Sequence, residues 1–312
     1  MKINLQVSRI PLKQIDFDDS FYELRPQGDD ELPADFIESI KKCGILHPPI
    51  LREQGNGAYI IMAGRRRLRA ARDILSLNSC NCLIVHSETS TLACLELVLE
   101  EGRLSPTWSP VMKAKYLAKI IAVIGREEAV VNVLPRLGIT PQMYHLEKLL
   151  GLADLEEPLA LAIHQGRVAE KTAYELSRLP FRDRFILFDL INSLKLSVGN
   201  QRQIFAICND LAKRASSSIH AVLSEPAITS ILKETGQNIP QQTAKLMKIL
   251  HVRRFPHFTA ANREFICWQN GLNLPAWAHI SHSPVFEVDQ VSLHLSFANR
   301  GKLADFCQQF IG

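Results

Sequence analysis

The sequence contains no apolar run long enough to cross a lipid bilayer, and its first residues lack the pattern of a secretory signal peptide. Its seven cysteines are odd in number and scattered over 312 residues, and only Cys80 and Cys82 lie close together. No cysteine or histidine spacing matches a zinc site. These absences argue against a membrane protein or a disulfide-stabilised domain. They predict a cytoplasmic protein with reduced, buried, structural thiols.

Positive and negative charges are nearly balanced over most of the chain. The net charge is +4, yet residues 181–257 alone hold 11 Lys and Arg against 5 Asp and Glu. A locally basic helical segment is a candidate DNA-binding surface, and Arg202, Lys213 and Arg214 are its candidate phosphate contacts. A solvated helical layer explains the same charge pattern equally well.

Acidic residues are absent from one stretch that is rich in arginine. Residues 58–63 are apolar and end at Gly64, which predicts a strand, and the Ala- and Leu-rich sequence after it predicts a helix. The first turns of that helix contain Arg65, Arg66, Arg67 and Arg69. A helix N-terminus disfavours cations, and no acid lies between these arginines and Arg72 to pair with them inside the helix. We therefore predict a phosphate or polyanion site, with a solvated arginine face as the alternative.

Hydrophobic periodicity and turn residues predict an α+β protein of four segments. Residues 1–105 alternate strands and helices, as expected for an α/β domain with a mixed sheet. A helical region at 109–180 and the basic helical extension at 181–257 follow. Residues 258–312 predict a small α-β-β-α unit, which is too short to bury a sufficient core alone and should dock or dimerise.

The second segment contains the pattern of a helix-turn-helix. Residues 126–137 predict a helix that Pro135 kinks or ends, and a turn at Gly138 separates it from a helix starting at Thr140 and Pro141. The candidate DNA contacts are Thr140, Gln142, His145 and Lys148. Because cations are scarce at the start of this helix, an exposed turn with no DNA role fits about equally well.

Two motifs resemble a known family. Gly44-Ile45-Leu46-His47-Pro48 precedes a hairpin, which is followed by Gly64-Arg65-Arg66-Arg67-Leu68-Arg69-Ala70-Ala71. These segments resemble the Gly-x-x-Gln-Pro and Gly-Glu-Arg-Arg-x-Arg-Ala patterns in the N-terminal domain of the ParB family of chromosome and plasmid partition proteins. Glu100 and Glu101 lie where that family has a Glu-Asn motif. The helix-turn-helix pattern and the α-β-β-α tail are similar to the family's DNA-binding and dimerisation domains.

The resemblance implies a ParB/sulfiredoxin-like N-terminal domain in a clamp-forming, nucleoid-associated DNA-binding protein that binds CTP with Mg²⁺. On that basis Gly64, Arg66 and Arg67 hold phosphates, and Glu100 coordinates Mg²⁺ or positions the attacking water. The remaining pocket residues would be Gly44, His47, Arg65, Arg69 and Glu101. The resemblance also implies a homodimer joined through the C-terminal unit, with a partition ATPase as a candidate partner.

Three departures from the family patterns keep alternatives open. His47, Arg65 and Glu101 replace the family's Gln, Glu and Asn, and the change at Glu101 leaves open whether CTP is hydrolysed or only bound. One alternative is a mobile-element regulator that has lost nucleotide chemistry. Another is a ParB-fold nuclease or phosphotransfer enzyme, which is less favoured because only Glu100 and Glu101 supply clustered carboxylates.

Overall fold

The computed structural model describes residues 5–29, 31–103, 108–233, 238–283 and 290–311. The chain forms two compact units, Met1–Arg202 and Gln203–Gly312, whose boundary falls within helix α10 (Val198–Arg214). The division into four segments stays a prediction, and its boundary near residue 105 lies outside the described residues. Within the described ranges, no helix combines the length and the apolar character that crossing a membrane requires.

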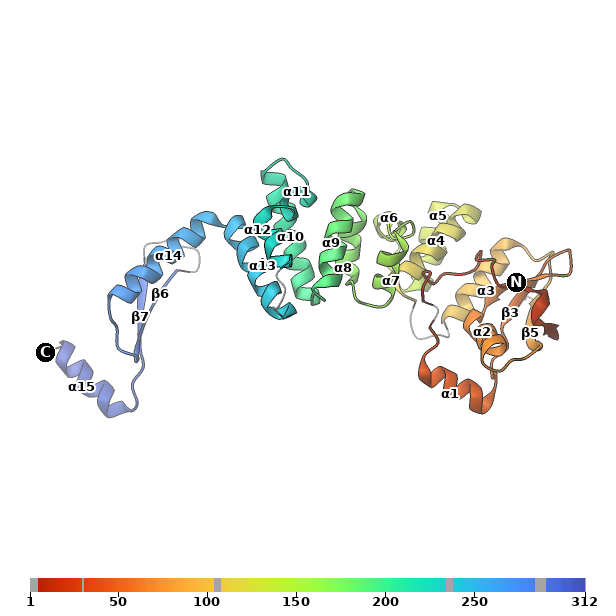
Figure 1. The fold of residues 1–312 in the computed structure, drawn as a ribbon, viewed down its shortest axis with the longest axis horizontal. Helices are drawn as coiled ribbons and strands as arrows, with labels where there is room; N and C mark the ends of the chain where they lie inside the picture. The colour runs from red at the N-terminus through yellow and green to blue at the C-terminus, as the bar shows by residue number, and fades with distance from the viewer. Residues whose placement is uncertain (1–4, 30, 104–107, 234–237, 284–289, 312) are drawn as a thin grey trace. The chain divides into compact units, whose positions relative to one another are not determined.

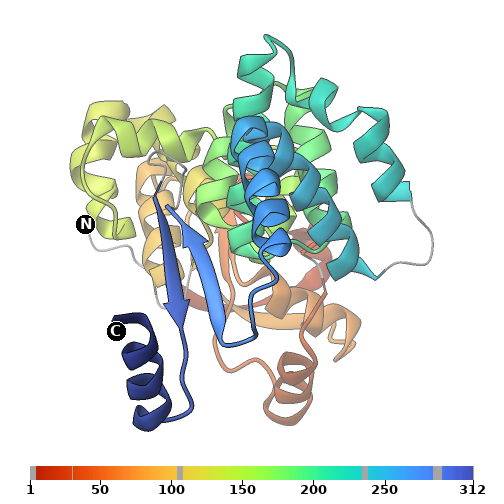
Figure 2. The same cartoon turned by 90° about the vertical axis from the view of Figure 1, so that its left-hand side faces the viewer.

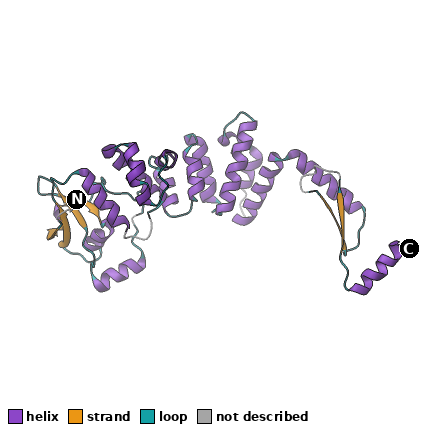
Figure 3. Ribbon diagram, turned by 180° about the vertical axis from the view of Figure 1, so that it is seen from behind, coloured by secondary structure: helices purple, strands orange, loops and turns teal. Residues whose placement is uncertain are grey.

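The first unit begins with a five-stranded mixed sheet (Figure 1, Figure 3). In spatial order its strands are β1 (Gln6–Pro11), β5 (Ser79–Val85), β3 (Ile50–Glu53), β4 (Tyr59–Ala63) and β2 (Ile15–Asp16). β3 pairs antiparallel with β4 and parallel with β5, while β1 pairs antiparallel with β5 and β2 parallel with β4. The mixed sheet predicted from the sequence is confirmed.

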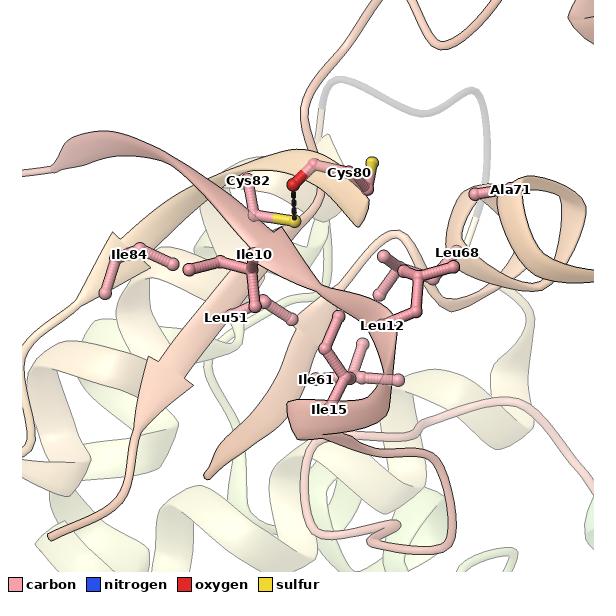
Figure 4. Packing of buried hydrophobic residues seen from close by; sticks show 10 residues of the cluster. All are labelled: Ile10, Leu12, Ile15, Leu51, Ile61, Leu68, Ala71, Cys80, Cys82 and Ile84. Carbon is pink, nitrogen blue, oxygen red and sulfur yellow. Dashed lines mark hydrogen bonds between the residues drawn. The ribbon is translucent and has the colours of Figure 1, made fainter. Parts of the chain in front are cut away.

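Packing against this sheet fixes the arginine-bearing helix. The sheet is accompanied by α1 (Ala34–Cys43), α2 (Arg65–Asp73) and α3 (Thr91–Arg103). The core cluster joins Ile10 of β1, Leu51 of β3 and Leu68 of α2 (Figure 4). Leu51 and Leu68 are fully buried, and burying each contributes roughly 1.5–3 kcal/mol. The burial of Leu68 therefore places the arginines of α2 at the end of β4.

All seven cysteines are free thiols. Four of them are buried, as predicted: Cys80, Cys82, Cys94 and Cys208. The prediction of burial is wrong for Cys43, the last residue of α1, and for Cys267, since both are exposed. Within β5 the Cys82 thiol lies 3.5 Å from the Cys80 carbonyl oxygen (Figure 4). The hydrogen bond with Cys80 and burial both raise the pKa of Cys82, which disfavours its thiolate form.

Helices follow the sheet domain in the first unit. They are α4 (Pro110–Ile124), α5 (Arg126–Glu128), α6 (Met143–Leu150), α7 (Glu157–His164), α8 (Glu170–Ser177) and α9 (Phe181–Ser193). Ser109 caps α4 by accepting a hydrogen bond from the Met112 backbone at 3.3 Å. After α5 come a π-helical segment, η2 (Ala129–Val133), and a 3-10 turn, η3 (Pro135–Leu137). The helix predicted over 126–137 is therefore α-helical only at its start, and Pro135, which has no N–H to donate, begins the 3-10 turn that follows the π-helical segment.

The second unit ends in a small element group with little buried surface. The unit contains α11 (Ile219–Leu223), α12 (Pro226–Lys233), α13 (Ile239–Arg254), α14 (Pro256–Gly271), β6 (Ala278–His282), β7 (Val291–Leu295) and α15 (Arg300–Ile311). β6 and β7 pair antiparallel, with Ile280 opposite Leu293 (Figure 2). Among the described residues from 258 onward, Ile280 is the only buried one, whereas Trp268, Trp277 and Leu293 are 47%, 44% and 56% exposed.

Candidate functional site

A cavity of about 890 Å³ lies beside the start of α2. Its walls come from the loop at residues 17–29, the start of α1, the end of β4, the first turns of α2, the end of α3 and the start of α4. Val98, Trp108 and Met112 contribute apolar surface, and the α2 arginines contribute charge. A cavity of this size with apolar walls and a few convergent charges suits a ligand as large as a nucleotide.

Gly64 makes the turn that brings the arginines to this cavity. It lies between β4 and α2 with φ at 87°, in the left-handed region that residues with a side chain rarely adopt. A Cβ at this position would be 3.0 Å from the Arg67 guanidinium. Glycine is therefore required here twice, for the backbone turn and for the approach of Arg67.

The first three arginines of α2 each have an acidic partner. Arg65 Nε lies 2.8 Å from a Glu23 carboxylate oxygen. Arg66 Nη2 lies 2.7 Å from Asp29 Oδ2, and Arg67 Nη2 lies 2.8 Å from Glu101 Oε1. The prediction that no acid within the helix pairs with these arginines holds, but the ion pairs with distant acids were not predicted. The partners come from the 17–29 loop and from α3, and not from the helix itself.

Charge inside the cavity is nearly balanced. Its lining includes the arginines Arg25, Arg65, Arg66, Arg67 and Arg69 and the acids Asp18, Glu23, Asp29 and Glu101. Five cations against four carboxylates leave a formal charge of +1. A polyphosphate that enters the cavity must therefore compete with carboxylates for the guanidinium groups.

The predicted pocket residues fall into two groups. Gly64, Arg65, Arg66, Arg67, Arg69 and Glu101 all line the cavity. Gly44 and His47 are described residues outside its lining. Gly44 ends α1 with φ at 70°, and the His47 carbonyl accepts a hydrogen bond from Arg67 Nη1 at 2.8 Å. His47 thus acts on the cavity through Arg67.

The two neighbouring carboxylates of α3 have different surroundings. Glu100 receives Arg136 Nη2 at 2.7 Å and Arg103 Nη1 at 3.2 Å, and its side chain is 52% exposed. The hydrogen bond from Arg136 is the main cause that lowers the pKa of Glu100. Glu101 lines the cavity, whereas Glu100 is outside its lining. Of these two residues, only Glu101 could therefore offer a carboxylate oxygen to a metal ion that is bound with phosphates in the cavity.

Other residues that form the cavity were not predicted from the sequence. Glu23 and Asp29 pair with arginines, and Trp108 lies against Gly102 at the end of α3. The glycine near the end of a helix was a usable signal, because glycine is unfavourable there unless close packing requires it. The acidic loop gave no local signal for its partners.

The predicted DNA contacts of α6 are unequally accessible. Thr140 and Gln142 are exposed and precede the first residue of α6, Met143, so the helix begins later than predicted. His145 is half-buried. Lys148 lies over the Tyr174 ring, with Nζ 4.2 Å from its centroid.

The three predicted basic contacts belong to different units. Arg202 is the last residue of the first unit, and Lys213 and Arg214 belong to the second. All three are exposed. Arg214 Nη1 donates to the Arg254 carbonyl at 2.7 Å, and Arg254 itself pairs with Asp210 at 2.5 Å.

Comparison with known proteins identifies the first part of the chain. The family model of the ParB N-terminal domain matches residues 2–100, which include the sheet, α2 and Glu100. Residues 2–100 are therefore similar to the ParB N-terminal domain. The "Probable chromosome-partitioning protein ParB" of Neisseria meningitidis is 28% identical over 160 residues, which are 51% of this chain and 53% of that protein. The stage 0 sporulation protein J of Bacillus subtilis is 26% identical over 226 residues, 72% of this chain and 67% of that one.

The chain thus spans about half the length of the ParB from Neisseria that it matches. Among solved structures, C-terminally truncated ParB from Caulobacter crescentus aligns in two forms at 20% identity. The form complexed to the centromeric parS site covers 62% of this chain and 96% of its own, with a TM-score of 0.34. The form complexed with CTP-γ-S covers 60% and 98%, with a TM-score of 0.23. Both TM-scores are below 0.5, so neither alignment establishes a shared arrangement.

Proposed function

We propose that this protein is a DNA-binding partition protein that binds CTP with Mg²⁺ in the α2 cavity and acts as a nucleotide-dependent clamp in DNA segregation. The observation that supports this most directly is the start of α2, where Gly64 and five cavity arginines converge within a ParB N-terminal domain. The names of the Neisseria relatives, which are chromosome-partitioning proteins, support the same process.

Residues of the cavity fit the parts of such a ligand. Arg66 and Arg67 would bind phosphate oxygens through their guanidinium forks, and Gly64 lets the backbone come close to them. Glu101 would offer one carboxylate oxygen to Mg²⁺, which neutralises phosphate charge when bound. No group of three His, Cys, Asp or Glu among the described residues could hold a metal alone, so the ion would arrive with the nucleotide.

The proposed DNA contacts are Thr140, Gln142 and His145 at the start of α6, with Arg202, Lys213 and Arg214 on phosphates. The proposed dimer forms through α14, β6, β7 and α15. The exposed Trp268, Trp277 and Leu293 support that interface, because a partner would cover these large apolar side chains.

A calorimetric titration of the full chain with CTP and Mg²⁺ tests the nucleotide site, with ATP and GTP as comparison ligands. We expect saturable heat with CTP that is lost in Arg66→Ala and Arg67→Ala. Arg72→Ala is the matched control, since Arg72 lies on the same helix outside the cavity lining and pairs with Asp73 at 2.7 Å. Absence of heat with every nucleotide would remove the proposal.

The near-neutral cavity supports a second candidate, a ParB-like regulator without nucleotide chemistry. In that protein the arginines would have a structural role only, held by Glu23, Asp29 and Glu101. This candidate predicts DNA binding that is indifferent to CTP, whereas the proposed clamp predicts that CTP changes it. A CTP-hydrolysing or nuclease activity has weaker support, because Glu100 contacts Arg136 and Arg103 outside the cavity lining.

A further inference from the structure

Residues 25–29 form a strap between the arginine helix and α7. On one side, the Gln27 backbone N–H donates to Glu157 Oε2 at 2.8 Å. Asp29 Oδ2 lies 3.1 Å from His164 Nε2. Between them, a Cβ on Gly28 would be 3.3 Å from the Leu161 side chain. Positions 157, 161 and 164 share one face of α7, so three consecutive strap residues follow one stripe of that helix.

On its other side, the strap contacts the arginines through the same carboxylate. Asp29 Oδ2 also accepts from Arg66 Nη2 at 2.7 Å and from Arg25 Nη1 at 2.9 Å. The Asp29 side chain is only 14% exposed. One oxygen atom therefore joins α2 of the sheet domain to the last residue of α7. The same histidine also contacts the start of α4. Its Nδ1 lies 2.8 Å from the Oγ of Ser109, the residue that caps α4.

We propose that Asp29 takes the place of a phosphate on Arg66, so that an anion entering the cavity displaces Asp29 and loosens the strap from α7. This inference rests on the proposed anion site, and it adds an affinity-setting residue and a route by which that site acts on the helical region. A carboxylate is the natural internal substitute, since carboxylate and phosphate both bind the guanidinium fork.

Charge explains why the anion and Asp29 compete. With four carboxylates already among five arginines, the cavity has little net charge to attract a polyphosphate. A phosphate carries more charge than Asp29 and therefore displaces it from Arg66 when bound. By linkage, the factor by which a bound anion weakens the docking of the strap on α7 equals the factor by which strap docking weakens anion binding.

The test uses the full chain with inorganic triphosphate as the probe. Asp29→Asn removes the competing charge but keeps the size of the side chain, and we expect it to bind triphosphate about five-fold tighter, equivalent to about 1 kcal/mol. Asp73→Asn is the matched control, because it removes a carboxylate from Arg72 at the far end of the same helix. Unchanged or weaker binding by Asp29→Asn would overturn the inference, since Asp29 would then only position Arg66.

A second measurement follows the strap itself. Hydrogen exchange at the Gln27 amide should become faster when triphosphate binds the wild-type chain. Separately, Glu157→Ala should bind triphosphate more tightly, because it removes the carboxylate to which the Gln27 amide donates. Slower or unchanged exchange on binding would contradict the displacement. If wild type binds CTP but neither variant binds triphosphate more tightly, the inference fails and the proposed function stands. If no variant binds CTP or triphosphate, both fail.

Discussion

The indole of Trp108 lies so close to Gly102 that a methyl group at position 102 would come within 2.1 Å of its Nε1. Gly102 belongs to the last turns of α3, and Trp108 precedes α4, so the contact joins two elements that line the cavity. Trp108 also packs edge-on against Tyr116, with ring centroids 5.1 Å apart. The indole is therefore fixed from two sides, and the wall it forms depends on glycine at position 102.

Gly102→Ala should lower the free energy of unfolding by about 1–3 kcal/mol, because the added methyl group overlaps the indole. Gly199→Ala is the matched control, since it also lies in a helix but has no atom within 4 Å of the added Cβ. Chemical denaturation measures both, and Gly102→Ala combined with Trp108→Leu should recover part of the loss. Equal stability of the two alanine variants would contradict the packing argument.

Gly64→Ala should cost about 1–2 kcal/mol of stability, because its backbone is left-handed. It should also weaken CTP binding, since the new Cβ would be 3.0 Å from the Arg67 guanidinium. Gly55→Ala, in open space on the preceding hairpin, serves as the control. Thermal denaturation and calorimetry give the two readouts. A Gly55→Ala variant that loses as much stability as Gly64→Ala would disprove the backbone argument.

The stability of the protein should fall as His164 becomes protonated. Burial lowers the pKa of His164, and the attraction of Asp29 offsets only part of this effect. The pKa of a histidine in the unfolded chain is about 6.5. Just below that pH, the unfolded chain therefore binds more protons than the folded chain. The free energy of unfolding should therefore decrease as pH falls from about 6.5 towards the lower folded pKa.

Urea denaturation at several pH values measures this dependence. His164→Gln should flatten it. A wild-type curve that rises as pH falls through this window would show that the folded state, and not the unfolded state, binds the extra proton.

Charge reversal of Arg202, Lys213 and Arg214 together should weaken DNA binding uniformly across sequences, because interactions with phosphates carry no sequence information. The slope of log affinity against log salt should fall by about 1 for each cation that no longer binds a phosphate. Arg254→Gln should have little effect, since Arg254 already pairs with Asp210 and lies over the Phe255 ring. Fluorescence anisotropy with two unrelated duplexes distinguishes this from a loss confined to one sequence.

Local sequence signals predicted much of the fold. The strand before Gly64, the helix after it and the hairpin between β3 and β4 depend on neighbouring residues, and all three are confirmed. The helical turns before Pro135 end at Val133, but only Arg126–Glu128 of the predicted helix is α-helical. The burial of cysteines was harder to predict, because it depends on which face of a helix packs. Cys43 and Cys267 lie on faces that no described neighbour covers.

The cavity was only half predictable for a related reason. Its arginines follow one another along the chain, but the acids that pair with Arg66 and Arg67 are 37 and 34 positions away. Such partners are brought together by the fold, so composition within a helix cannot indicate them. The same distance in sequence concealed the interactions of residues 25–29 with α7, which are more than a hundred positions further along.

The uneven burial of the seven thiols has a practical consequence. Cys43 and Cys267 are exposed and lie in different units, whereas Cys80, Cys82, Cys94 and Cys208 are buried. A maleimide dye should therefore react with one native side chain per unit once the half-exposed Cys307 is replaced by serine. Dyes on these two cysteines would allow single-molecule energy transfer to be measured between the two units, before and after CTP or DNA is added.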